Sequence, residues 1–163
     1  MTAPTFRIIV EEIMSTHHAL LRRELPQITD MLKSLTENAD SAPLDEAQMI
    51  FQKVRSKVET HLRDEETVLF PTGIALESGS RPEQSEMNFL ERLAEMEKEH
   101  DGCSKTLDGV SHTIAEHAPD SELKDKLLKA IELVQLDFVS HVDKENNTVH
   151  PMFIELIALS QRI

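Results

Sequence analysis

The segment from His141 to Pro151 constrains the fold of this chain more than any other. His141 and Glu145 are four residues apart, which on a helix places their Cβ atoms about 5–6 Å apart on one face. That face is otherwise apolar, because the pair continues a series of residues spaced alternately three and four apart, the pattern of a packed helix. The series consists of Leu127, Ile131, Val134, Phe138, His141, Glu145, Thr148 and Met152. An ionisable pair within an apolar face costs desolvation free energy and therefore requires a partner.

Four long helical patterns of this kind follow one another. We predict helices over residues 5–35, 44–70, 83–117 and 122–150, and a short apolar helical tail after the last of them. Pro26 is expected to kink or restart the first helix, because proline lacks a backbone donor and clashes with the preceding turn. Pro71 and Gly73 are assigned to the longest loop, which runs to Pro82. The sequence thus predicts an all-α fold, an antiparallel four-helix bundle with a C-terminal helical tail, in one domain over residues 1–163.

Each predicted helix carries one histidine on its apolar face. These histidines are His18, His61, His100 and His141. Glu65 and Glu145 follow two of them at a spacing of four residues. The segments 61–71 and 141–151 match at histidine, glutamate and proline with an offset of 80, and the other two histidines differ by 82. The chain therefore reads as two similar helical hairpins packed face to face.

A metal centre explains these six side chains together. A single buried histidine is most often satisfied by an ordinary hydrogen bond. Six ionisable groups on facing apolar surfaces would each need such an explanation. Four imidazoles and two carboxylates suit two divalent or trivalent ions, with Glu65 and Glu145 as bridges. Bundle cores hold carboxylate-bridged pairs of iron or manganese ions in this way.

Several of these segments resemble a known family. His18–Pro26, His61–Pro71, Glu99–Asp101 and His141–Pro151 are similar to the hemerythrin-like HHE domain, and more closely to the Repair of Iron Centers branch of di-iron proteins. The resemblance covers nearly the whole chain and implies a hemerythrin-like bundle with two iron ions (Fe2+/Fe3+) and a bridging oxo or hydroxo group. The ligands that it implies are His18, His61, Glu65, His100, His141 and Glu145. Met96 and Ser104 stand where oxygen-carrying hemerythrins would place a second histidine on the third helix.

Three neighbours of the implied ligands are further candidates. His17 competes with His18, but only His18 continues the apolar seam of its helix, so His17 is expected to be an alternative ligand or to contact a ligand. Glu99 could shape the access of a ligand to the centre. The alternative is that Glu99 is an ordinary exposed glutamate on the surface of its helix. Cys103 lies one layer from His100 and could therefore contact that ligand. The alternative is that Cys103 packs in the core as a small buried hydrophobic residue.

Other ionisable residues are expected on the surface. His150 lies off the seam, nearly opposite His141, which predicts exposure at the helix end and leaves its role open. His112 and His117 are likewise predicted to face solvent. A solvated face is predicted for Asp64, Glu66, Asp143 and Lys144.

Composition excludes several classes of partner. The formal net charge of −13 argues against nucleic acid and against an anionic membrane surface. No apolar run approaches the ~20 residues of a membrane span, and two glutamates interrupt the place of a signal peptide's apolar core. The single cysteine allows no intrachain disulfide. We therefore expect a cytoplasmic protein.

The resemblance implies a non-haem di-iron protein that binds a diatomic ligand, for which nitric oxide is the first candidate and dioxygen the second. It could reduce nitric oxide, act in nitrosative or oxidative stress, or serve iron–sulfur cluster repair, with an electron donor or an iron–sulfur protein as partner. The alternative is a di-iron oxygen or redox sensor, or an iron-storage or donor module, that acts through a protein partner without catalysis. A purely structural bundle, in contrast, would bind no metal.

Overall fold

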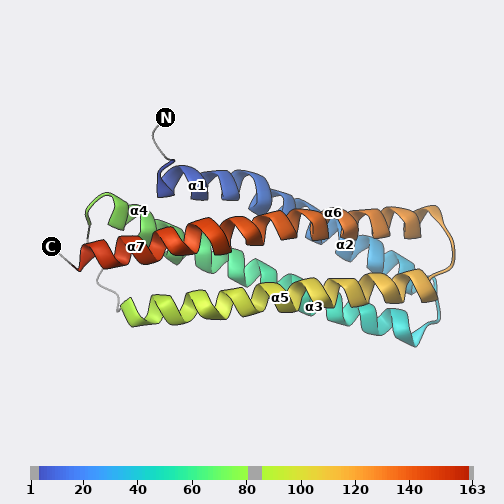
Figure 1. The fold of residues 1–163 in the computed structure, drawn as a ribbon. Helices are drawn as coiled ribbons and strands as arrows, with labels where there is room; N and C mark the ends of the chain where they lie inside the picture. Colours follow the sequence, from blue (N-terminus) through green and yellow to red (C-terminus); the bar gives the residue numbers. More distant parts are fainter. Residues whose placement is uncertain (1–3, 81–85, 162–163) are drawn as a thin grey trace.

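The structure is a computed structural model that describes residues 4–80 and 86–161 (Figure 1). Its α-helices are α1 (Phe6–Ile13), α2 (Ala19–Glu37), α3 (Ala42–Asp64), α4 (Phe70–Glu77), α5 (Glu86–His117), α6 (Glu122–Lys144) and α7 (His150–Ser160). Three π-helical segments, η1 (Met14–His18), η2 (Glu65–Leu69) and η3 (Glu145–Val149), join neighbouring helices without a break. The described residues thus form four long helical rods, α1–η1–α2, α3–η2–α4, α5 and α6–η3–α7. This confirms the predicted all-α bundle with a C-terminal helix.

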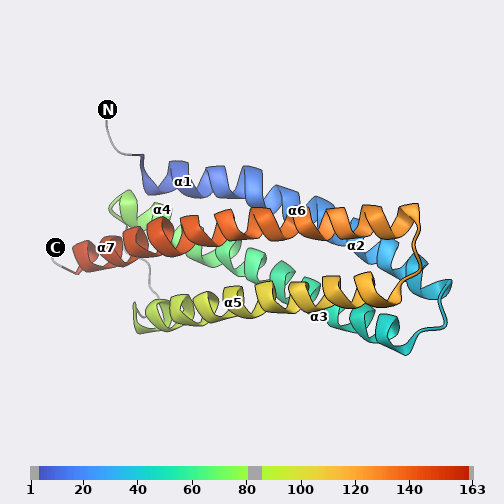
Figure 2. The same ribbon diagram turned by 45° about the vertical axis from the view of Figure 1, so that its right-hand side comes forward.

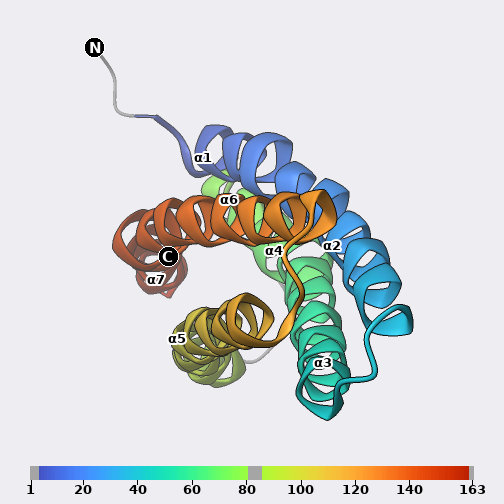
Figure 3. The same ribbon diagram turned by 90° about the vertical axis from the view of Figure 1, so that its right-hand side faces the viewer.

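The four rods surround one long core. α2 packs against α3 and α6, and α5 packs against the same two helices. Figure 3, viewed along the bundle, shows these rods around a common centre. The loops that join α2 to α3 and α5 to α6 lie at one end, whereas α4, α7 and the start of α1 lie at the other (Figures 1 and 2). Successive rods therefore run antiparallel.

Two apolar clusters fill the bundle. One, near the interhelical loops, contains Phe51, Ile114 and Ile131 among its fully buried members. The other, at the end that contains α1, α4 and α7, contains Phe6 and Phe153. The Glu77 carboxylate anchors α4 to this second end, because it accepts hydrogen bonds from the backbone N–H groups of Phe6 at 2.6 Å and Arg7 at 3.2 Å. The predicted metal ligands lie between the two clusters.

The second rod continues past the proline that was expected to end it. The assignment of Pro71 and Gly73 to a loop is wrong, because both lie in α4. Pro71 cannot donate to the carbonyl four residues before it and would clash with that group in a regular helix. η2 opens the preceding turn, so that the Phe70 N–H bonds to the Glu65 carbonyl five residues back. Gly73 fits here because a Cβ atom at this position would collide with the ring of Phe6.

The first rod also differs from prediction. Pro26 was expected to kink or restart the helix; α2 runs through this residue, so the restart is wrong, and the kink stays a prediction. The α-helical pattern changes instead at η1, where the Ala19 N–H reaches back five residues to Met14. The predicted start of the third helix at residue 83 and the loop residues Arg81 and Pro82 lie outside the described residues. Among the helices in the described part of the chain, none has the length and hydrophobicity needed to cross a bilayer.

Candidate metal centre

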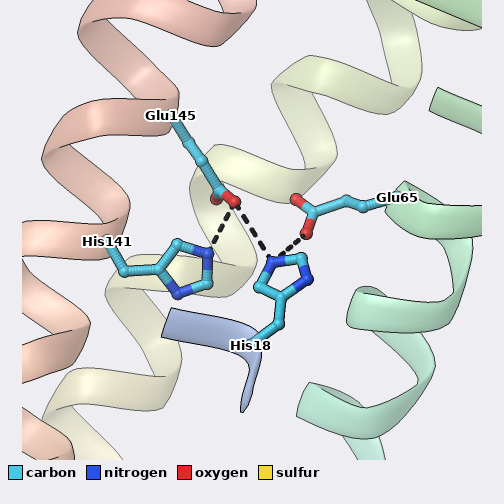
Figure 4. A group of neighbouring side chains, drawn as sticks. All are labelled: His18, Glu65, His141 and Glu145. Atoms are coloured by element: carbon cyan, nitrogen blue, oxygen red, sulfur yellow. Dashed lines mark hydrogen bonds and ion pairs between the residues drawn. The ribbon is translucent and has the colours of Figure 1, made fainter. Parts of the chain in front are cut away.

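The six predicted ligands meet in the middle of the bundle, and all of them are buried. Each rod contributes at least one: His18 from η1, His61 and Glu65 from α3 and η2, His100 from α5, and His141 and Glu145 from α6 and η3. Figure 4 shows four of them with their polar ends directed toward one another. Three of the six stand within a π segment, where the wider turn sets the direction of the side chain.

The two glutamates each face histidines on both sides of the centre. Glu65 places Oε1 2.9 Å from His61 Nε2 and Oε2 3.2 Å from His18 Nε2. Glu145 places Oε1 2.6 Å from His141 Nε2 and Oε2 3.2 Å from His100 Nε2. Two ligands in neighbouring positions, each about 2.1 Å from an ion, stand about 3 Å apart. The observed spacings match the edges of such a coordination shell.

These atoms form two groups that could each hold an ion. One group consists of His18, Glu65, His141 and Glu145, and the other of His61, Glu65, His100 and Glu145; within each group the ligand atoms lie within 4.8 Å of one another. Both glutamates belong to both groups, as bridging ligands would. Apart from these close contacts with one another, the Nε2 atom of His18 and both oxygens of Glu65 are buried without a hydrogen-bond partner. Buried polar atoms of this kind are normally satisfied, so the donor set fits a pair of metal ions.

The electrostatics of the centre show how the protein balances these charges. Burial opposes a charged His18, but Glu145 and Glu65 outweigh it and raise the pKa of His18 to about 9. Burial likewise opposes a charged His61, and Glu65 outweighs it, so that the pKa of His61 is also raised to about 9. The pKa values of Glu65 and Glu145 lie below the usual range, because hydrogen bonds from histidines overcome burial and mutual repulsion. Burial, with repulsion from His61, lowers the pKa of His100 to about 4. Without metal, two imidazolium groups thus neutralise two carboxylates.

Carboxylates outside the cluster hold two of the histidines. Glu66 Oε1 lies 2.8 Å from His18 Nδ1, and its carboxylate accepts two hydrogen bonds from Arg22 at 2.6 and 2.8 Å. The prediction that Glu66 belongs to a solvated face is therefore wrong. Glu99 Oε2 lies 3.1 Å from His61 Nδ1, which gives this half-exposed residue a contact with the centre. Carboxylate partners on the second ring nitrogen are typical of metal-binding histidines.

His17 lies beside the centre but outside both groups. Its Nδ1 atom is 2.8 Å from Asp137 Oδ1, and its ring lies parallel to that of His141 with ring centroids 5.2 Å apart. Between the two neighbouring histidines, the geometry therefore places His18 among the potential ligands. His17 contacts the predicted ligand His141, and its Nε2 atom is buried without a partner.

His150 is the clearest failure of the sequence prediction. It is 2 % exposed, not surface-exposed as predicted, and its Nδ1 atom lies 3.3 Å from Glu97 Oε1. The reason is η3, which widens the turn before His150 and rotates this side chain toward the interior. Phe70, 80 residues earlier, occupies the matching place after η2 and stacks on His18 with ring centroids 5.8 Å apart. The sequence did contain a signal for this burial. The residue at the matching position of the first segment is Phe70, and an apolar residue there indicates that the position faces the interior.

A small cavity adjoins the centre. It has a volume of about 20 Å³, room for about one water-sized molecule, and its walls include His61, His100 and His141 together with apolar residues. Cys103 is buried in the wall as predicted, and burial raises the pKa of its thiol. His112 and His117 are exposed, also as predicted, with side chains 75 % and 45 % accessible.

Comparison with models of known protein families identifies the family of this bundle. The family model for the hemerythrin HHE cation-binding domain matches residues 10–153. This match covers most of the chain, which therefore belongs to the hemerythrin HHE family, and the buried histidine–glutamate cluster is compatible with the cation site that the family's description names. No curated protein matches the chain.

Proposed function

We propose that this protein is a non-haem di-iron protein that binds nitric oxide or dioxygen, with His18, His61, Glu65, His100, His141 and Glu145 as ligands. The proposal rests above all on the two four-residue groups that share both glutamates and adjoin a cavity of about 20 Å³. Two iron ions, joined by the carboxylates and by an oxo or hydroxo group, would supply an open position for a diatomic ligand and exchange electrons with it.

The protein's own residues support this function in three ways. Each group offers four donors, fewer than the six of an octahedral ion, so the chain does not fill the coordination shell. Leu21, Val58 and Phe138 line the cavity and favour a small apolar molecule over water. Glu66 and Glu99 orient imidazoles from outside and increase their basicity.

The similarity to the Repair of Iron Centers branch favours nitric oxide as the ligand and a role in nitrosative or oxidative stress or in iron–sulfur cluster repair. Such a role requires an electron donor or an iron–sulfur protein as partner. A cytoplasmic location fits the single, buried cysteine, because thiols stay reduced in that compartment.

Metal content and the visible spectrum test the proposal. Aerobically purified protein is expected to hold two iron ions per chain and to show diferric absorption, and the reduced protein is expected to change its spectrum when nitric oxide is added. The double variant His61→Ala/His141→Ala is expected to lose the iron, whereas His112→Ala, an exposed histidine variant, retains it. Stoichiometric zinc without colour, or unchanged iron in the double variant, would refute the di-iron assignment. Catalytic formation of nitrous oxide with a reductant would identify an enzyme, and stoichiometric binding alone a sensor or carrier.

A further inference from the structure

A groove of about 420 Å³ lies between α3 and α5, next to the cavity at the centre. Three lysines, Lys53, Lys57 and Lys98, contribute to its walls, and Glu99 is the one acidic residue among the lining side chains that the structure describes. The whole chain has a formal charge of −13. The groove therefore carries a local charge opposite to that of the molecule.

The positive charge of this groove is not neutralised by neighbours. None of its three lysines forms an ion pair with a residue in the described part of the chain. Five of the six lysines elsewhere do pair with carboxylates, namely Lys33, Lys105, Lys124, Lys126 and Lys144, whereas Lys129 has no such pair among the described residues. The Glu99 carboxylate is already engaged, with one oxygen 3.1 Å from His61 Nδ1 and the other 3.5 Å from Arg92. An anion in the groove would thus meet ammonium groups without an internal counter-ion.

The groove also leads toward the metal centre. Lys57, Glu99 and Cys103 line both the groove and the inner cavity, whose lining also includes His100. Lys57 lies close enough to Cys103 to offset part of the effect of burial on the thiol. These three shared residues mark the boundary between the two hollows.

The matching place in the other half of the molecule is built differently. By the offsets of 80 and 82, Asp137 corresponds to Lys57 and His17 to Glu99. Asp137 and His17 are hydrogen-bonded at 2.8 Å, and His17 packs on the ring of His141. A lysine without an ion pair thus stands on one side of the centre, and a hydrogen-bonded histidine–aspartate pair on the other.

We propose that the lysine-lined groove binds small monovalent inorganic anions, of the size of azide or nitrite, and passes them to the centre between Lys57, Glu99 and Cys103. The destination of the anion rests on the proposed function, whereas the preference of the groove for anions is a property of the polypeptide without metal. Three uncompensated ammonium groups attract a monovalent anion and leave a neutral gas unaffected.

Alkylation of Cys103 tests the groove in the metal-free, folded protein. Iodoacetate and iodoacetamide are similar in size and react with the same thiolate, but only iodoacetate is an anion. The ratio of their rates therefore reports electrostatic attraction independently of the thiol pKa. We expect this ratio to fall roughly three- to tenfold in the triple variant Lys53→Gln/Lys57→Gln/Lys98→Gln. Lys57→Gln alone is expected to give part of the same effect.

A second triple variant, Lys33→Gln/Lys126→Gln/Lys129→Gln, makes the same change in net charge away from the groove and is expected to keep the wild-type ratio. An equal fall in both triple variants, or an unchanged ratio in the first, would refute a specific anion site. Failure of both reagents to reach Cys103 in the folded protein would refute the path.

The loaded protein tests the destination. The groove variant is expected to slow the association of azide with the diferric centre, followed by absorption, and to leave nitric oxide binding to the diferrous protein unchanged. If azide binds at the wild-type rate although the alkylation ratio has fallen, the groove does not serve the centre. If neither ligand perturbs the centre in wild-type protein, the proposed function itself fails, separately from the anion preference of the groove.

Discussion

The binding of two divalent metal ions near pH 7 is expected to release two protons from the centre. His18 and His61 carry these protons in the metal-free protein, because the nearby carboxylates outweigh burial and raise the pKa of each to about 9. A metal ion binds only the unprotonated nitrogen, so each ion must displace a proton. Glu65 and Glu145 contribute none, since their pKa values already lie below the usual range.

The size of this competition follows from the pKa values. At pH 7 the two imidazoles lie about two units below their pKa, and each displaced proton costs roughly 2–3 kcal/mol. The pair therefore weakens metal binding by about 5 kcal/mol at pH 7, or about four powers of ten in the overall constant. Affinity is expected to rise with pH and to level off above about 9.

Stability of the metal-free protein is expected to change in the opposite direction. The folded pKa values of His18 and His61 are raised, so their stabilising effect is fully present below about pH 6.5 and is lost as the pH rises through about 9. Chemical denaturation of metal-free protein between pH 6.5 and 9.5 measures this loss directly.

Isothermal titration with Co2+ in two buffers of different ionisation enthalpy measures the proton release. The expected result at pH 7 is close to two protons per pair of ions, falling toward zero above pH 9. His112→Ala, which removes an exposed imidazole, is expected to leave the number unchanged. Release of fewer than one proton per pair at pH 7 would show that the metal-free centre is not neutralised by two imidazolium groups.

Two further predictions concern packing and the support of the ligands. Gly73→Ala is expected to destabilise the protein by about 1–3 kcal/mol in urea denaturation, because the new Cβ collides with the buried ring of Phe6. Gly109→Ala, at an open helical position, is the matched control and is expected to stabilise by about 0.5–1 kcal/mol; equal stability of both variants would contradict this packing. Glu66→Gln is expected to weaken metal binding by roughly 10–100-fold in competition with a chelator, because His18 loses its carboxylate partner. Wild-type affinity in this variant would show that the contact does not support the ligand.

The periodic part of the fold could be read from the sequence. Apolar residues at spacings of three and four predicted four helices and brought His18, His61, His100 and His141 to one place, because a helix repeats every 3.6 residues whatever its partners are. The same seams placed Glu65 and Glu145 four residues after His61 and His141. Each of these residues continues a regular seam, so no tertiary information was needed to place it.

The irregular part could not be read in this way. A π turn shifts every later residue around the helix axis, and the spacing of apolar residues does not predict where such a turn occurs. This is why His150 was expected on the surface and why Pro71 was expected to end its rod. Glu66 was misplaced for another reason: its contacts with His18 and Arg22 join different rods, and the pattern of one helix does not contain them.

The position of the centre between the two apolar clusters has a consequence for cooperativity. The cluster around Phe51 and the cluster around Phe6 lie on opposite sides of a layer of buried histidine and glutamate side chains. The polar layer contributes little apolar contact between the two ends, and we therefore expect that in metal-free protein the end that contains α1, α4 and α7 opens while the other remains folded. Metal ions that bind ligands from all four rods would oppose that partial opening, because separating the rods would break metal–ligand bonds. Occupancy of the centre is therefore expected to decide whether the bundle unfolds as one unit or as two.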